Sequence, residues 1–208
     1  MRLEECFRPI AKKERLILVE GRNDALLVGE MCKEERLTDS VQILCYSQVG
    51  KLGGYLDVLV RDSGFELVKR IGLTRDADVG AERAIQSLKG AWTRALAALK
   101  SIGREVPECL FFAIPDNQNL GRLENLCLLS AKFPGILECA EQMYECAKRV
   151  ASHEIDREKS IVAAYLSMME RPGLQLGTGA QAGCWDLRSA AFVSLRDFVL
   201  SIGSQTGG

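Results

Sequence analysis

The sequence predicts an α/β protein built on a mostly parallel sheet of about four strands, with helices on both faces. Short apolar runs alternate four times with longer segments whose apolar residues recur at helical spacing. The apolar runs are unbroken, which is typical of strands buried on both faces. Hydrophobic residues make up 47% of the 208 residues, which is enough for a substantial core.

The first half of the chain supplies the predicted sheet. The expected strands are residues 15–21 (RLILVEG), 40–47 (SVQILCYS), 66–76 (ELVKRIGLTRD) and 107–117 (PECLFFAIPDN), the last of which is stopped by Pro115. Residues 24–37 and 81–103 have the apolar spacing of helices, and residues 48–64 are expected to form a glycine-rich turn followed by a helix-like segment that stops near Gly64. Asn23 or Asp24 would cap the first of these helices.

The pattern changes after residue 125, where no further strand is indicated. Residues 128–150, 158–171 and 186–203 are expected to be helical, and residues 172–183 to form a loop. We therefore expect a single domain over residues 1–208. Its core would span about 14–125, its helical extension about 126–202, and the tail 203–208 would be disordered.

Composition narrows the possible functions. The net charge of −1 implies no long-range positive field, so a nucleic-acid site would have to be a local patch. A zinc site is disfavoured because the chain has one histidine and eight cysteines with no CxxC pair. The charged N-terminus and the lack of a long apolar run predict neither a signal peptide nor a membrane span. We expect a cytoplasmic protein with free thiols, and the oligomeric state stays open.

Acidic residues follow the predicted strands. Glu20 ends the first strand, Asp76 and Asp78 end the third, and Asp116 ends the fourth, with Glu124 in the segment beyond it. In an open parallel sheet, ligands bind beyond the carboxyl ends of the strands, so these acids are expected to converge on one edge. Carboxylates without histidine suit a hard cation, Mg²⁺ or Mn²⁺. Two simpler alternatives stay open: Asp78 caps the helix near residue 81, and Glu124 is ordinary first-turn charge.

Four segments resemble a known fold family. LVEGRNDALLV (residues 18–28) and GLTRDADVG (72–80) resemble the TOPRIM fold of topoisomerases, primases and overcoming-lysogenization-defect nucleases. In that fold a glutamate follows the first strand and a DxD follows the third. AIPDNQNLGRLENL (113–126) and AYLSMMERPGLQLGTG (164–179) look like segments of a small stand-alone TOPRIM-like family of uncharacterised proteins. The resemblance covers roughly residues 14–200.

The resemblance implies Mg²⁺-dependent phosphoryl transfer on nucleic acid, foremost as a nuclease. By motif position, Asp76 and Asp78 would hold the metal, and Glu20 would be a ligand or general acid/base. Asp24 matches an acid that helps to hold a second metal in nuclease-type members. The resemblance matches Asp116 and Glu124 by position alone. Basic residues also gather near the site, and the candidate phosphate contacts are Arg22, Lys51, Arg75 and Arg122; the alternative is that they are part of an ordinary solvated surface. Nucleic-acid binding should be weak and metal-dependent.

Two other functions remain as alternatives. The first is a non-catalytic binding or regulatory module, which would keep the fold, with or without the metal, and would lack turnover. Two features favour it: the near-zero net charge, and the lack of the ATPase, zinc or tyrosine domains of larger members. A receiver-like phospho-acceptor would need a lysine at the end of a late strand. The fourth strand ends AIPDN, without one.

Overall fold

The core of the protein is a parallel sheet. The computed structural model describes residues 7–46, 52–171 and 173–204. Within these residues, four strands form one all-parallel sheet in the order β2-β1-β3-β4. The strands are β1 (Arg15–Val19), β2 (Val41–Cys45), β3 (Arg70–Asp76) and β4 (Glu108–Ile114). The predicted fold class, an α/β protein with a mostly parallel sheet of about four strands, is confirmed, and β1 and β3 are the central strands.

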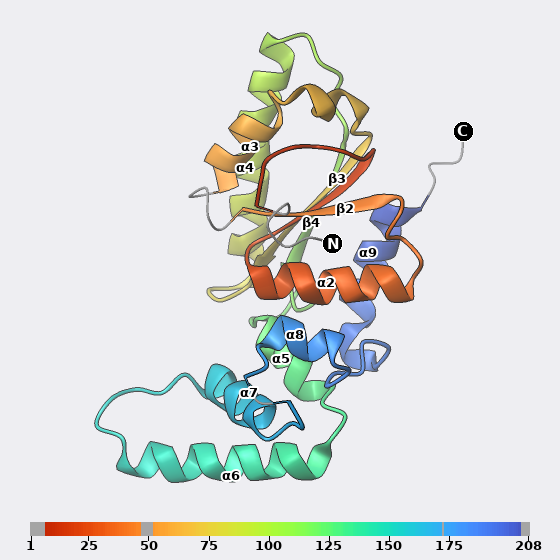
Figure 1. Ribbon diagram of the computed structural model, residues 1–208. Coiled ribbons are helices and arrows are strands. Elements are labelled where there is room, and N and C mark those ends of the chain that lie inside the picture. The colour runs from red at the N-terminus through yellow and green to blue at the C-terminus, as the bar shows by residue number, and fades with distance from the viewer. Residues whose placement is uncertain (1–6, 47–51, 172, 205–208) are drawn as a thin grey trace.

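Helices cover both faces of this sheet because its strands are apolar on both faces. Leu16 and Leu18 of β1 pack into a core that includes residues of α3 (Leu52–Leu59), η2 (Ser63–Leu67) and α4 (Ala81–Ser101). Ile17 and Val19 point into a second core, shared with α2 (Arg22–Glu34) and α9 (Val193–Gly203). Figure 1 shows α3 and α4 on one side of the sheet and α2 and α9 on the other.

The remaining C-terminal helices extend the second core away from the sheet. They are α5 (Leu123–Leu129), α6 (Pro134–Val150), α7 (Arg157–Ser167) and α8 (Leu176–Gln181), followed by η3 (Ala190–Phe192). In Figure 1, α6 and α7 lie farthest from the strands, while α8 packs on α2. Buried side chains from α5 to α9 belong to the same core cluster as Ile17. The single-domain organisation stays a prediction.

Several details differ from the sequence prediction. Residues 130–133 interrupt the segment expected to be helical over 128–150, and β3 begins at Arg70 and not at residue 66. Residues 172–183 are not all loop, because Leu176–Gln181 form α8. Its Gly177 lies so close to α2 that a Cβ there would come within 2.7 Å of the Asn23 carbonyl oxygen, and such packing has no periodic signature. The final helix begins at Val193 and not at residue 186, after a turn and η3. The expected disordered tail is wrong for Gly203, which ends α9, and residues 205–208 lie outside the described part.

Candidate metal centre at the carboxyl edge of the sheet

The acids of the first and third strands meet at one edge of the sheet, as predicted. Glu20 directly follows β1, Asp76 is the last residue of β3, and Asp78 lies two residues further along. Because β1 and β3 are parallel neighbours, their carboxyl ends lie side by side. Glu20 and Asp78 are exposed, whereas Asp76 is partly buried.

Asp24 joins this edge from the first turn of α2. Its Oδ2 accepts a hydrogen bond of 2.5 Å from the backbone N–H of Gly21, which closes the turn between β1 and the helix. The prediction that Asn23 or Asp24 caps this helix is wrong, because the N-cap is Gly21; Asp24 is instead the third helical residue, and its side chain reaches back to the N-cap backbone. That backward reach holds its carboxylate next to the strand ends.

The loop after β4 folds back and delivers the last acid. The backbone N–H of Ala77, between the two aspartates, donates to the carbonyl oxygens of Ile114 and Gly121, both at 2.9 Å. Asn117, at a positive φ of 67°, accepts a 2.7 Å hydrogen bond from the N–H of Ala113 and tightens the loop. The pairing of Ala77 with Gly121 places Arg122 and the start of α5, with Glu124 in its first turn, beside Asp76.

We call Glu20, Asp24, Asp76, Asp78 and Glu124 the acidic cluster. Burial, the largest cause, and the charges of the other four members together raise the pKa of Asp76 to about 8. Burial likewise raises the pKa of Asp24 to about 7; the Gly21 hydrogen bond opposes this, and the charges of Glu20 and Glu124 add to it. Without a cation, both groups therefore hold protons over part of the neutral range.

The chemistry of this cluster fits a hard divalent cation. The Oδ1 atom of Asp76 is buried and has no hydrogen-bond partner among the described residues. All five cluster members offer carboxylate oxygens, which are the ligands that Mg²⁺ and Mn²⁺ prefer. As the side chains stand, no three Asp, Glu, His or Cys residues in the described ranges are close enough to hold one ion. Shared coordination of one ion by these carboxylates therefore stays a prediction.

Asp78 has a different partner from the other acids. The Nε of Arg122 lies 2.9 Å from its Oδ1, and the Nη1 of Arg122 lies 2.7 Å from the Oδ2 of Asp156. The alternative that Asp78 caps α4 is wrong, because the N-cap is Gly80, at a φ of 113°, and no side chain caps that helix. A nearby arginine thus offsets part of the repulsion within the DxD pair. For Glu124 the expected position in the first turn of a helix is confirmed, and its charge also acts on Asp76 and Asp24.

The remaining predicted site residues are Asp116, Arg22, Arg75 and Lys51. Asp116 lies in the β4–α5 loop, and its carboxylate accepts hydrogen bonds from the backbone of Gln118 and Asn119 and from the Asn119 side chain. Burial alone would raise the pKa of Asp116, but these hydrogen bonds lower it overall. Arg22 and Arg75 are exposed, and Arg75 donates to Ser87 Oγ at 2.8 Å. Lys51 lies outside the described residues.

Two residues next to the cluster were not predicted. Tyr46 follows β2, and its hydroxyl donates to the Thr74 carbonyl oxygen at 3.0 Å. Its burial, with the charge of Glu20, raises the pKa of that hydroxyl. Asp156 caps α7, with its Oδ1 accepting from the Lys159 N–H at 3.1 Å. The sequence marks Asp156 as a helix start before an apolar run, but nothing in it indicates the pairing with Arg122.

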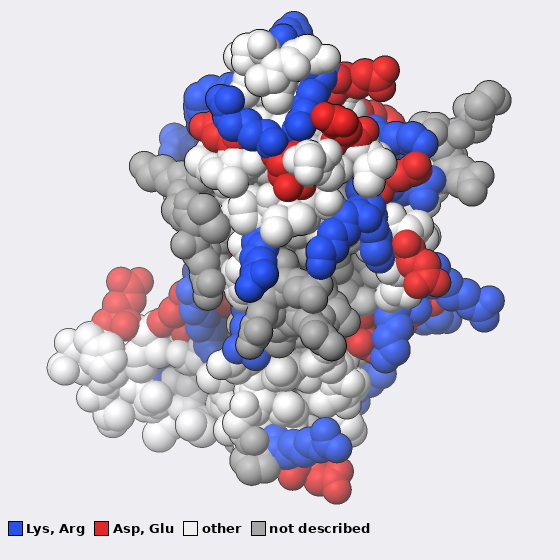
Figure 2. All heavy atoms as spheres, turned by 45° about the horizontal axis from the view of Figure 1, so that its top comes forward, with Lys and Arg blue, Asp and Glu red and all other residues white. Residues whose placement is uncertain are grey.

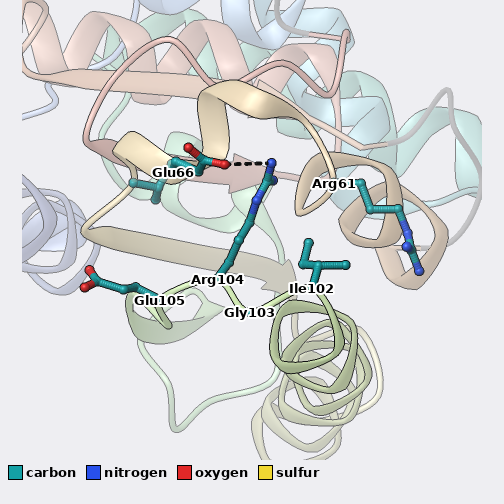
Figure 3. A pocket seen from close by; sticks show the side chains of 7 residues that line it. Arg61, Glu66, Ile102, Gly103, Arg104 and Glu105 are labelled. Carbon is teal, nitrogen blue, oxygen red and sulfur yellow. Dashed lines mark ion pairs between the residues drawn. The ribbon is translucent and has the colours of Figure 1, made fainter.

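A hollow of about 630 Å³ lies at the opposite edge of the sheet, where β3 and β4 begin. Figure 3 shows Arg104 pointing across it toward Glu66, at 3.1 Å, with Arg61 turned outward. Arg104 also donates to the carbonyl oxygens of Val60 and Asp62, at 2.8 and 2.6 Å, so it ties two loops together. In Figure 2, which turns this end toward the viewer, basic and acidic side chains alternate. In this view, the described residues at this end of the molecule carry charges of both signs side by side.

The fold and the acidic cluster define an α/β protein with a four-stranded parallel sheet and a carboxylate site at the carboxyl ends of its central strands. A family model described as a protein of unknown function, DUF3226, matches residues 14–202, and the chain belongs to this family. No curated protein matches the chain significantly, and no solved structure does. In the described residues no helix is both long and apolar enough to span a membrane.

Proposed function

We propose that this protein is a Mg²⁺- or Mn²⁺-dependent phosphoryl-transfer enzyme that acts on nucleic acid as a nuclease. The observation that carries the proposal is Asp76: its Oδ1 is buried without a hydrogen-bond partner among the described residues, and burial together with four other carboxylates raises its pKa. A buried carboxylate is costly to ionise unless it is paired or coordinates a metal. The choice of nucleic acid as substrate rests on the resemblance of residues 18–28 and 72–80 to TOPRIM proteins.

In this proposal the cluster residues have separate roles. Asp76, Asp24 and Asp78 would hold the cation, which when bound polarises a phosphodiester oxygen and offsets charge in the transition state. Glu20, exposed at the end of β1, would accept a proton from the attacking water or return one to the leaving group. The exposed Arg22 and Arg75 would contact flanking phosphates.

A cleavage assay tests the proposal. Labelled single- and double-stranded DNA and RNA would be incubated with the protein in Mg²⁺, Mn²⁺ or chelator. We expect cleavage of at least one substrate with a divalent ion, and its loss in Asp76→Ala. The matched control is Asp57→Ala, which removes an exposed acid from α3. Equal cleavage by Asp76→Ala and the control would show that the activity does not come from this site.

A second candidate function is a cation-dependent binding or regulatory module without turnover. The observation that favours it is the engagement of the nearby arginines: Arg122 pairs with Asp78 and Asp156, and Arg75 with Ser87. Both side chains would have to leave these partners to contact a phosphate. Divalent-ion binding that depends on Asp76, with no cleavage of any of the substrates, would favour this function over the nuclease.

A further inference from the structure

Arg122 bridges two carboxylates from distant parts of the chain. Its Nε contacts Asp78 at the end of β3, and its Nη1 contacts Asp156 before α7. The exposed fractions of the side chains are 27% for Arg122, 34% for Asp156 and 57% for Asp78. The guanidinium is therefore the more protected part of the bridge, and its pKa is raised, first by the hydrogen bond to Asp156.

The backbone holds each member of this bridge in place. Gly121 forms an antiparallel bridge with Ala77, which brings Arg122 next to the short segment that carries Asp76 and Asp78. The N–H of Arg122 itself donates to Asn125 Oδ1 at 2.8 Å, at the start of α5. Asp156 is fixed by its hydrogen bond to the Lys159 N–H. The bridge is thus anchored at three points, unlike a pair of long side chains meeting on a surface, which contributes little.

We infer that Arg122 is an internal counter-cation that competes with the divalent ion for Asp78, and that Asp156 sets how strongly it competes. This inference rests on the proposed function, because it concerns the same carboxylate site. Arg122 and a divalent ion carry like charges, so both cannot be held at the Asp78 carboxylate without repulsion. When the ion binds, Asp78 leaves Arg122 and coordinates the ion. Arg122 then remains paired with Asp156 alone.

The consequence is a link between the site and the C-terminal helices. Asp156 lies between α6 and α7, the two helices farthest from the sheet in Figure 1. Any change that moves the start of α7 changes how Asp156 shares the guanidinium with Asp78. The affinity of the carboxylate site for a cation therefore depends on a segment that contributes no carboxylate to the acidic cluster. Arg122 acts as a positioning residue in this scheme.

Calorimetric titration with Mn²⁺ tests the competition. We expect Arg122→Gln to bind Mn²⁺ about tenfold more tightly than the wild type, because the substitution removes a positive charge beside the site. The gain is limited because Asp78 is exposed, and water screens the interaction between its carboxylate and Arg122. Arg122→Lys keeps the charge and should stay within about threefold of the wild type. The control Arg188→Gln removes the same charge from the exposed pair with Glu34, and should leave the affinity unchanged.

A double-mutant cycle tests the role of Asp156. Asp156→Asn leaves Asp78 as the only carboxylate bonded to Arg122, so we expect Mn²⁺ binding to weaken several-fold. In the Arg122→Gln background the same change should have little effect. An equal loss in both backgrounds would mean that Asp156 acts only through its charge and would overturn the link to α7.

The NMR signal of the Arg122 Nε–H provides a readout that needs neither activity nor a change in affinity. The signal, assigned by its loss in Arg122→Gln, should shift on addition of Mg²⁺ as Asp78 leaves. Metal binding by the wild type with equal affinity in Arg122→Gln and an unmoved Nε–H signal would overturn this inference alone. No binding to the wild type or to any variant would overturn the proposed function, and this inference with it.

Discussion

Removing the charge of Asp76 should stabilise the metal-free protein at neutral pH. In the folded state burial raises the pKa of Asp76 to about 8, and neighbouring acids contribute to that value. In the unfolded chain an aspartate has a pKa of about 3.9. Folding at pH 7 therefore requires the uptake of a proton at this site. Asp76→Asn removes that requirement, because the neutral amide has no charge to desolvate.

The magnitude follows from the difference between the two pKa values. Between about pH 3.9 and pH 7 the cost grows by about 1.4 kcal/mol per pH unit, which gives an upper limit of about 4 kcal/mol. The protonation of Asp24 is coupled to that of Asp76, so we expect a gain of about 1–3 kcal/mol at pH 7. The folded-state pKa is the higher one. Stability linked to this group is therefore fully present below about pH 4 and is lost as the pH rises toward 8.

Urea unfolding in chelator, followed by the fluorescence of Trp92 and Trp185, measures this effect at pH 5, 7 and 8.5. The gain in Asp76→Asn over the wild type should increase with pH. Asp57→Asn, at an exposed position on α3, is the control and should show no such trend. A gain that does not grow with pH, or a loss at every pH, would refute the argument from burial and repulsion.

Three further predictions concern packing, domain organisation and partners. Gly72→Ala should destabilise the protein by about 1–3 kcal/mol in urea unfolding, because the new Cβ would lie 2.6 Å from Phe198 Cζ and 2.9 Å from Ile202 Cδ1. An unchanged midpoint would mean that α9 shifts freely on β3. Limited proteolysis should yield no stable fragment ending near residue 125, and such a fragment with a cooperative melt would reveal a second domain. Binding of labelled oligonucleotides should need Mg²⁺ or Ca²⁺ and should weaken steeply with salt. Tight binding in chelator would contradict the metal-bridged interface.

The strand ends were the most predictable part of the site. Unbroken apolar runs identify strands buried on both faces, and the residue after each run lies at the carboxyl edge by the geometry of parallel strands. Glu20 and Asp76 follow from that rule alone, since β1 and β3 are neighbours. Asp24 was named from the resemblance, and its local hydrogen bond to Gly21 explains its position.

The parts that escaped prediction depend on contacts between distant segments. The pairing of Arg122 with Asp156 joins residues 34 positions apart, and no periodicity records it. The short helix α8 was expected to be loop because its sequence, LGTGAQ, contains two glycines. Those glycines instead permit close packing: Gly177 meets α2, and a Cβ on Gly179 would lie 2.8 Å from Leu166 Cδ2. Tertiary contacts there outweigh the low helix propensity.

The two aspartates of the DxD segment lie in different electrostatic environments, although only Ala77 separates them. Ala77 between them is fully buried and hydrogen-bonded to the loop that carries Gly121, so the backbone is fixed and the side chains take separate partners. Asp76 faces the other acids and is costly to ionise, whereas Asp78 faces Arg122. A cation that binds at Asp76 removes a cost, and one that binds at Asp78 must displace an existing partner. The two positions therefore oppose each other in their effect on affinity, which is why substitutions at Asp76 and Arg122 are expected to change cation binding in opposite directions.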